Sequence, residues 1–380
     1  MPLDPRSLAW ATLAHKVLPQ RELVALLRAF GDPATILQAP RAQIARVAGA
    51  VVADEVVAPL TQDRLDATSR WLDDPLHDLV AWDDADYPRA LLELGYAPPA
   101  LFYIGRRELL GRPALAIVGS RHATPQGLDT ARAFAAALAA AGLTIVSGLA
   151  LGIDAAAHEG ALQTDASTLG VMGTGPDRMY PARNRDLAQR IAAAGGLLTE
   201  YVPGTPPRKE NFPRRNRLIS GLARGVLVVE ATLSSGSLIT ARLAGEQGRE
   251  VFAIPGSIHS PFAKGCHKLI REGAKLVETA QDILDELNGV LAAETAVNPR
   301  GAARPPAGRP PKRAAAHPAS AGTPCEASAL LVAMGHDPVT LDTLIARTGL
   351  APATLTAELV SLELAERVGV LPGGYWQRRD

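Results

Sequence analysis

The sequence predicts an α/β protein in which a helical domain precedes a parallel sheet and a small domain of helices and a hairpin follows it. Between about Leu79 and Leu291, short apolar runs alternate with helical patterns. Apolar runs without polar alternation are typical of strands covered on both faces, as in parallel sheets wrapped by helices. The pattern therefore indicates a Rossmann-like core. The runs that carry this prediction are ALAIVGS, LTIVSGL, TLGVMGTG, GVLVVEA and EVFAIPGS.

Residues 1–74 are predicted to form an all-helical domain. From Leu8 to about Trp71 the apolar residues recur at helical spacing, and the Gly-Asp-Pro stretch at Gly31 to Pro33 interrupts the pattern. We therefore place the boundary near residue 74 and assign residues 75–292 to the sheet domain.

Residues 293–325 are predicted to be a disordered linker. From residue 295 to 325 the chain holds seven prolines, many alanines and several cations, but no acidic residue. Such a composition cannot bury a core. We expect a basic, Pro/Ala-rich connection between two folded parts.

Residues 326–380 regain the patterns of a folded domain. Two helical patterns, TLDTLIARTGL and APATLTAELVSLELAERV, are joined by a short turn. The stretch GVLPGGYWQRR after them is typical of a hairpin. This order of elements predicts a winged helix.

Charge and cysteine content limit the classes of function. The net charge is +0, so nucleic-acid binding would depend on local clusters of cations. No basic leader and no apolar stretch of membrane-spanning length is present, so we expect a cytoplasmic protein that does not contact membranes. The cysteines Cys266 and Cys325 lie far apart without a C-x-x-C motif, which argues against a disulfide framework and a structural zinc site.

Several predicted strands end in small residues that are suited to phosphate binding. Parallel strands present their carboxyl ends at one edge of the sheet, and loops there expose backbone N–H groups. One such loop holds Gly119, Ser120 and Arg121, and a later one holds Ser235, Gly236 and Ser237. The alternative is that these loops are only tight turns. No P-loop is present, and GTGPDR lacks the third glycine of a dinucleotide fingerprint, so we assign no cofactor.

The sequence offers few candidates for catalysis. Asp154 and His158 are four residues apart on one helical pattern, but a capping aspartate and a packed histidine are the more common arrangement. Glu230 follows a strand without a nucleophile or second carboxylate nearby in the sequence. Cys266, His267 and His259 match no metal-ligand spacing. We assign no catalytic residue and no metal ligand.

The segment RKENFPRRNR, residues 208–217, gathers five cations around one aromatic ring. Its cations can neutralise phosphates, each adding salt-dependent affinity. Phe212 offers a face on which an unpaired base can stack, and we expect it to lie on a loop stiffened by Pro213. Asn216 can donate to and accept from a base edge or a phosphate. Because bases in a duplex have no free faces, this segment favours single strands.

These stretches together resemble the DNA-processing protein A family, DprA or Smf. The resemblance rests on AIVGSR, VSGLALGIDAAAHEGAL, GVMGTGPDRMYPARNRDL, NFPRRNRLISGLARGVLVVEA, SGSLITARLAGEQGREVFAIPG and GCHKLIREGAKLV. It implies a non-enzymatic protein that binds single-stranded DNA, protects it and loads the recombinase RecA on it in natural transformation. The N-terminal helices are similar to the family's domain of the sterile-alpha-motif or helix-hairpin-helix type, and the C-terminal segment is similar to its winged helix.

The resemblance also implies positions for the binding sites. Arg121 corresponds to a DNA-contacting arginine, and Lys209 with Phe212 fall in the binding pocket. From the motifs and the resemblance together, the expected DNA-binding residues are Gly119, Ser120, Arg121, Lys209, Asn211, Phe212, Arg215, Asn216, Arg217, Ser235, Gly236 and Ser237. The family forms homodimers through the later part of the sheet domain, and RecA is expected to engage an overlapping or nearby patch. The expected dimer or partner surface comprises His267, Leu269, Ile270 and Leu276.

Two other functions are weighed against this one. A nucleoside-monophosphate phosphoribohydrolase has a similar architecture, but it needs a P-G-G-x-G-T loop with paired Arg and Glu residues, and that loop is absent. A duplex-DNA regulator would read the groove through the winged helix. Its recognition helix, expected from Ala353 to Leu364, carries Glu358 and Glu363 and no cation, which disfavours groove binding.

Overall fold

The computed structural model describes residues 4–92, 94, 97–165, 167–287, 326–365, 367–371 and 373–378. The predicted linker, 293–325, lies outside the described residues. The chain divides into two compact units. The first comprises Met1–Ala123, Gly127–Pro255 and Phe262–Ala280, and the second comprises Thr124–Gln126, Gly256–Pro261 and Gln281–Asp380.

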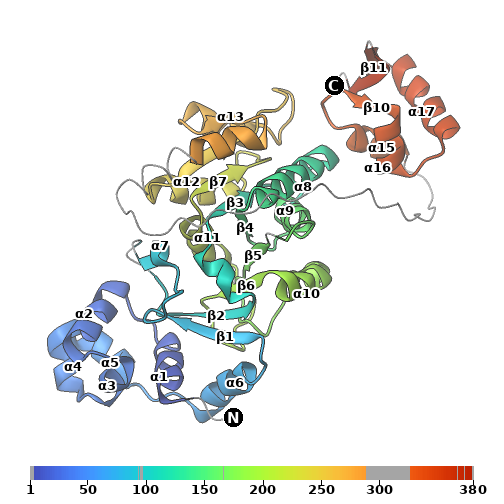
Figure 1. Cartoon of the computed structure of the whole chain (residues 1–380). Helices are drawn as coiled ribbons and strands as arrows, with labels where there is room; N and C mark the ends of the chain where they lie inside the picture. The colour runs from blue at the N-terminus through green and yellow to red at the C-terminus, as the bar shows by residue number, and fades with distance from the viewer. Residues whose placement is uncertain are drawn as a thin grey trace. The chain divides into compact units, whose positions relative to one another are not determined.

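The first unit begins with a group of short helices, as the apolar spacing predicts (Figure 1). They are α1 (Pro5–Ala14), α2 (Gln20–Phe30), α3 (Pro33–Gln38), α4 (Arg41–Ala48), α5 (Ala50–Val57) and α6 (Gln62–Leu72). The Asp4 side chain accepts from the N–H groups of Arg6 and Ser7 and so caps α1. Leu26, Ile36 and Ile44 are fully buried and form a small core between these helices.

A nine-stranded sheet follows among the described residues, in the order β1-β2-β6-β5-β4-β3-β7-β8-β9. The strands are β1 (His77–Ala81), β2 (Ala100–Gly105), β3 (Ala114–Val118), β4 (Thr144–Ser147), β5 (Thr168–Val171), β6 (Gly196–Thr199), β7 (Gly225–Val228), β8 (Glu250–Ala253) and β9 (Lys275–Leu276). All neighbours from β6 to β9 pair in parallel, which confirms the predicted parallel sheet. The antiparallel pairings of β1 with β2 and of β2 with β6 were not predicted.

Helices cover both faces of this sheet. They are α7 (Arg89–Leu92), α8 (Pro125–Ala140), α9 (Ile153–Ala161), α10 (Arg185–Ala194), α11 (Asn211–Leu222), α12 (Ser237–Glu246) and α13 (Lys264–Arg271), with 3-10 turns at Arg107–Gly111 and Ala182–Asn184. In Figure 1, α9 and α10 lie on one side of the strands and α11 and α12 on the other. The strand order reverses between β3 and β7, which is the position where sheets of this kind bind ligands.

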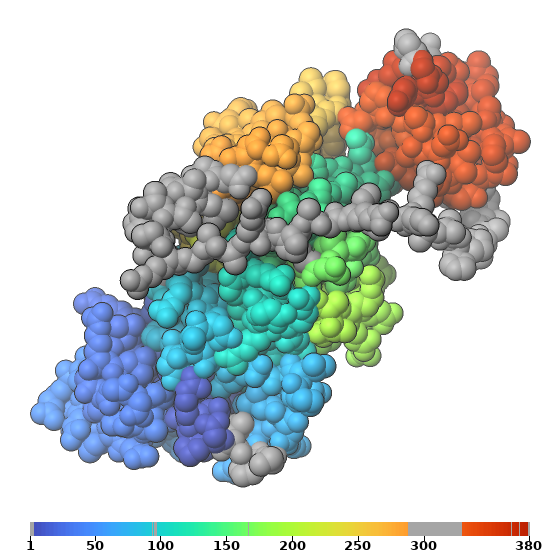
Figure 2. Space-filling model, in the orientation of Figure 1, coloured from blue at the N-terminus to red at the C-terminus, as the bar shows by residue number. Residues whose placement is uncertain are grey.

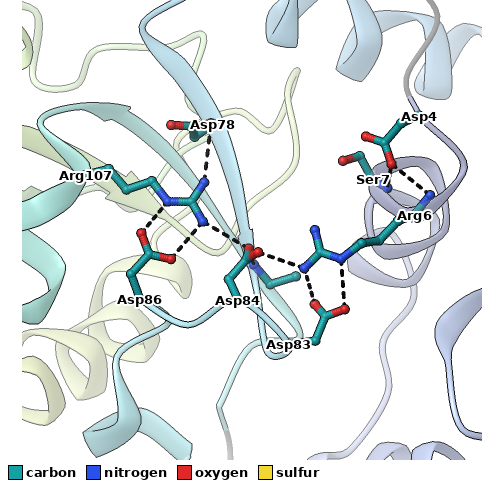
Figure 3. Close-up of polar contacts among 9 residues, drawn as sticks. Asp4, Arg6, Ser7, Asp78, Asp83, Asp84, Asp86 and Arg107 are labelled. Carbon is teal, nitrogen blue, oxygen red and sulfur yellow. Dashed lines mark hydrogen bonds and ion pairs between the residues drawn. The ribbon is translucent and has the colours of Figure 1, made fainter.

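Ion pairs fasten the N-terminal helices to the β1–β2 hairpin (Figure 3). Arg6 donates to Asp83 and, at 2.8 Å, to Asp84. Arg107 pairs with Asp86 and, at 3.2 Å, with the same Asp84. Asp84 therefore links two arginines that belong to different parts of the chain. Figure 2 shows the N-terminal helices, in dark blue, in contact with the lighter blue segments that follow them.

The second unit contains a small domain of helices and strands. Its elements are α15 (Glu326–Met334), β10 (Val339–Thr340), α16 (Leu341–Thr348), α17 (Pro352–Leu364), β11 (Val368–Leu371) and β12 (Tyr375–Arg378). The strands pair in the order β10-β12-β11, and Leu344, Leu355 and Leu359 are fully buried between helices and strands. This is the predicted winged-helix order of elements. Within the described parts of the chain, no helix is both long and apolar enough to cross a membrane.

Candidate nucleic-acid interface

A cavity of about 430 Å³ opens at the carboxyl ends of β3 and β7, where the strand order reverses. It lies at the position expected for ligand binding in an open α/β sheet. Nine of the twelve residues that the sequence predicts for DNA binding line it: Gly119, Ser120, Arg121, Phe212, Arg215, Asn216, Ser235, Gly236 and Ser237. Segments far apart in the sequence therefore meet at one site.

The loop after β3 is shaped by close backbone contacts. A Cβ at Gly119 would lie 2.6 Å from Ile153 Cγ1 and 2.9 Å from the Glu230 carbonyl oxygen, so a side chain does not fit there. The Ser120 N–H donates to the same carbonyl at 2.8 Å. The Ser120 hydroxyl accepts from the N–H of His122 at 3.1 Å. The turn leaves the Arg121 side chain exposed at the cavity.

Phe212 lies in the first turn of α11, and the prediction that it lies on a loop is wrong. Pro213 is compatible with this turn because its missing N–H would have no partner within the helix. The Phe212 ring is half-buried. The ring packs against Gly173: a Cβ added at this glycine would lie 2.8 Å from Cδ1 of Phe212, so a side chain does not fit there.

Tyr180 is an aromatic neighbour that the sequence analysis missed. Its ring centroid lies 5.4 Å from that of Phe212, with 38° between the ring planes, which is within the range for favourable aromatic pairs. Tyr180 is 50% exposed. The stretch RMYPAR offered a signal, because it sets a tyrosine between arginines, but only the fold brings it beside Phe212.

Arg215 does not lie on the surface as predicted, because it is only 4% exposed. Its guanidinium donates to the carbonyl oxygens of Val171 and, at 2.7 Å, of Gly148, at the ends of two neighbouring strands. Burial lowers the pKa of Arg215 to about 10, so the group is charged at neutral pH. Its main role here is to hold the floor of the cavity.

Asp154 supplies a negative charge near Arg215. Its carboxylate accepts from the N–H groups of Gly148, at 3.1 Å, and Ala150, at 3.4 Å, and so it ties the loop after β4. The prediction that Asp154 caps this helix is wrong, because the N-cap of α9 is Gly152 and Asp154 lies within the first turn. Burial raises the pKa of Asp154, and the positive charge of Arg215 opposes this effect.

Three of the predicted residues lie outside the lining of this cavity. Arg217 is largely buried and forms an ion pair with Glu200, so it is not a surface cation as expected. Asn211 is buried and donates to the Gly173 carbonyl at 3.1 Å. Lys209 is exposed in the turn before α11. Of the five cations in this segment, Arg208, Lys209 and Arg214 therefore remain at the surface.

The serine-rich loop before α12 forms the opposite wall. The Ser235 hydroxyl accepts from the N–H of Thr232 at 2.9 Å, which closes the loop. Ser237 begins α12, and its buried Oγ has no hydrogen-bond partner in the described part of the chain. A buried hydroxyl without a partner is costly, and a ligand oxygen in the cavity would satisfy it.

Comparison with known proteins identifies the family. The family model described as DNA recombination-mediator protein A matches residues 78–288, more than half of the chain. The chain belongs to this family. A second model, the DprA winged helix domain, matches residues 313–374, in agreement with the C-terminal fold.

Named members of the DNA recombination-mediator protein A family are similar over most of their length. Protein Smf of Escherichia coli is 40% identical over 311 residues, covering 81% of this chain and 79% of that protein. The X-ray structure of DNA processing protein A from Streptococcus pneumoniae has a TM-score of 0.65 at 39% identity and covers 75% of this chain and 99% of that chain. A structure that concerns the single-stranded DNA binding mode of DNA processing protein A from Helicobacter pylori has a TM-score of 0.52 at 32% identity. It covers 56% of this chain and 96% of that chain.

The residues expected to form the family's dimer surface do not all reach the surface of this chain. Leu269 is 8% exposed and belongs to the main core, so its assignment to a partner surface is wrong. Ile270 is partly buried against the same core, and His267 is half-buried. Leu276 lies on the edge strand β9 and is 50% exposed. Leu276 is therefore the member of the set best placed to contact a partner.

Two of the groups considered for catalysis or metal binding, His158 and Cys266, are fully buried. His158 is fully buried, and its Nδ1 lies 2.7 Å from the Thr168 hydroxyl. Burial lowers the pKa of His158 to about 3, which confirms the interpretation as a packed, neutral histidine. Burial raises the pKa of Cys266 to about 12. Across the ranges that the structure describes, no group of three or more His, Cys, Asp or Glu residues could hold a metal ion.

Proposed function

We propose that this protein binds single-stranded DNA, with little sequence preference, at the cavity between β3 and β7. The observation that carries the proposal is the pair of rings of Phe212 and Tyr180, next to a cavity that also presents the exposed Arg121. Proteins bind single strands by stacking bases on aromatic side chains and by placing cations beside the phosphates.

The same geometry disfavours a duplex as ligand. Bases in B-DNA are stacked and paired, so rings at a cavity mouth find no free base face. Because every base has a face on which a ring can stack, this mode is tolerant of sequence. The serine hydroxyls and the Asn216 amide can bond to phosphates or to base edges without selecting one base.

We also propose that the bound strand is protected and passed to RecA, that the protein forms a homodimer, and that it acts in the cytoplasm without catalysing a reaction. Membership in a family of recombination mediators supports transfer to a recombinase. The exposed Leu276 on the edge strand β9 supports a dimer through the end of the sheet. The burial of His158, Asp154 and Cys266 in structural roles supports a binding function rather than catalysis.

A binding comparison tests the proposal. Filter binding of the full chain is measured with a single-stranded oligonucleotide and with the same sequence as a duplex, each at two salt concentrations. We expect the single strand to bind at least about tenfold more tightly, with affinity falling as salt rises. Equal or tighter binding of the duplex would contradict the proposal and favour the winged helix as the DNA-binding part.

A further inference from the structure

A second cavity, of about 490 Å³, lies on the other side of the N-terminal end of α11. The loop from Ala14 to Gln20, between α1 and α2, forms one wall. The other walls are the stretch Pro98 to Ala100 before β2, the residues after β6 from Glu200 to Val202, and α11 itself. The cavity therefore lies between the N-terminal helices and the sheet, within the first unit.

The lining of this second cavity carries more positive than negative charge. Four cations line it, against the single carboxylate of Glu200: Lys16, Arg208, Arg214 and Arg217. The Glu200 carboxylate is already paired with Arg217 and lies 3.8 Å from Arg214. His15 adds no charge, because burial lowers its pKa to about 4. Arg208 and Arg214 are exposed, so the cavity offers two cations to an anionic ligand.

The N-terminal end of α11 separates the two cavities. Phe212 and Arg215 line the first, whereas Asn211 and Arg214 line the second. The first cavity opens at the ends of β3 and β7 and the second at the end of β6, and these strands run parallel in one sheet. Both cavities therefore lie at the carboxyl edge of the sheet. A helix is about 10 Å across, a span of about three nucleotides at the spacing found in one strand of a duplex.

We infer that a DNA strand held at the first cavity continues over the N-terminal end of α11 into the second cavity. Arg208 and Arg214 then neutralise its phosphates, and the Tyr201 ring and the prolines Pro98 and Pro99 provide apolar surface for its bases. The N-terminal helices form a wall of the DNA-binding site. This inference rests on the proposed single-strand binding at the first cavity and extends it to a longer footprint.

The test uses two labelled oligothymidylates with the full chain, one of about 6 nucleotides and one of about 16, because sites of this kind span about 4 to 16 nucleotides. The parent should bind the longer strand at least about tenfold more tightly. In the double variant Arg208→Ala and Arg214→Ala, the longer strand should bind only about threefold more tightly than the shorter one, or less. The slope of log affinity against log salt for the longer strand should fall by about 1.4, since two phosphate contacts are lost.

A matched control and a second readout separate the outcomes. Arg41→Ala removes an exposed arginine of α4 that lines neither cavity, and it should leave the tighter binding of the longer strand unchanged. A photo-crosslinking residue at the exposed Val17 of the loop wall should crosslink to the longer strand, and one at the exposed Val51 on α5 should not.

Unchanged tighter binding of the longer strand in the double variant, together with absence of crosslinking at Val17, would overturn the inference while the first cavity still binds DNA. Failure of the parent to bind either oligonucleotide would instead overturn the proposed function. The two failures are therefore distinguishable by the behaviour of the shorter strand with the parent.

Discussion

The ring of Phe212, in the first turn of α11, packs against the ring of Tyr180, which lies in the segment after β5, with 5.4 Å between their centroids. The pair fixes the position of Phe212 at the mouth of the first cavity. It also explains how a half-buried ring can be ordered before a ligand binds, since less side-chain entropy is then lost on binding.

Phe212→Ala should weaken binding of single-stranded DNA about 10- to 100-fold, which corresponds to the loss of one stacked base. Because the ring is only half-buried, the free energy of unfolding should fall by less than the roughly 3 to 5 kcal/mol expected for a core phenylalanine. Phe212→Trp should retain most of the affinity. Fluorescence anisotropy and urea unfolding measure the two effects. A large loss of stability with unchanged affinity per folded molecule would show that the ring serves only the core.

Arg121→Ala and Lys209→Ala should each weaken single-strand binding and reduce its salt dependence. Both side chains are exposed, and each phosphate contact contributes about 0.7 to the slope of log affinity against log salt for a single strand. The slope, measured over several salt concentrations, is the readout. Arg41→Ala serves as the control for a general change in charge. Slopes equal to that of the parent in both variants would exclude these residues as phosphate contacts.

Arg215→Met should destabilise the fold by about 3 to 5 kcal/mol, because it leaves a buried carboxylate without its counter-charge and two buried carbonyl groups without a donor. Arg214→Met, one residue earlier on the exposed side of α11, should cost less than about 1 kcal/mol. Urea unfolding of both variants makes the comparison. Equal stability of the two would contradict a structural role for Arg215.

The stability of the sheet should decrease as the pH falls below 6.5, because His158 is held neutral in the folded chain. Its folded pKa of about 3 lies below the unfolded value of 6.5, so in this window the unfolded state binds more protons. At pH 5, His158 alone should lower the free energy of unfolding by about 2 kcal/mol. His158→Gln should flatten the dependence of unfolding free energy on pH. Parallel curves for the variant and the parent would show that His158 has the same pKa in the folded and unfolded chain.

Leu276→Glu should convert the proposed homodimer to a monomer, because it places a charge on the exposed apolar residue of the edge strand β9. Sedimentation equilibrium of the full chain at tens of micromolar is the measurement. Val51→Glu, at an exposed valine of α5, is the control and should leave the mass unchanged. A parent that sediments as a monomer would contradict the dimer itself.

The sequence allowed the parallel core to be predicted because its strands are apolar on both faces, as in Leu115, Ala116 and Ile117 of β3. The strand β2 was missed because its place depends on antiparallel pairing with β6, which follows much later in the chain, and β1 joins the sheet only through β2. The start of α11 was missed because its first turn is polar and contains Pro213, features shared by loops and helix starts.

The candidate site could be predicted at the level of loops but not of individual cations. Glycine and serine at strand ends mark places where the backbone approaches a ligand, and these positions line the first cavity. Whether an arginine is exposed depends on tertiary partners. Arg215 meets carbonyl groups of two strands, and Arg217 meets Glu200, neither of which is near in the sequence.

The carboxylate of Asp84 helps to hold α1, which leads into the loop wall of the second cavity. The loop wall of the second cavity follows α1 directly, and Arg6 of α1 is anchored through Asp84 to the same acidic cluster that holds Arg107. The pair is partly solvent-exposed, so salt screens it. Rising ionic strength is therefore expected to weaken two kinds of contact at once: those between the cations and the DNA strand, and the ion pair that anchors α1 beside the loop wall.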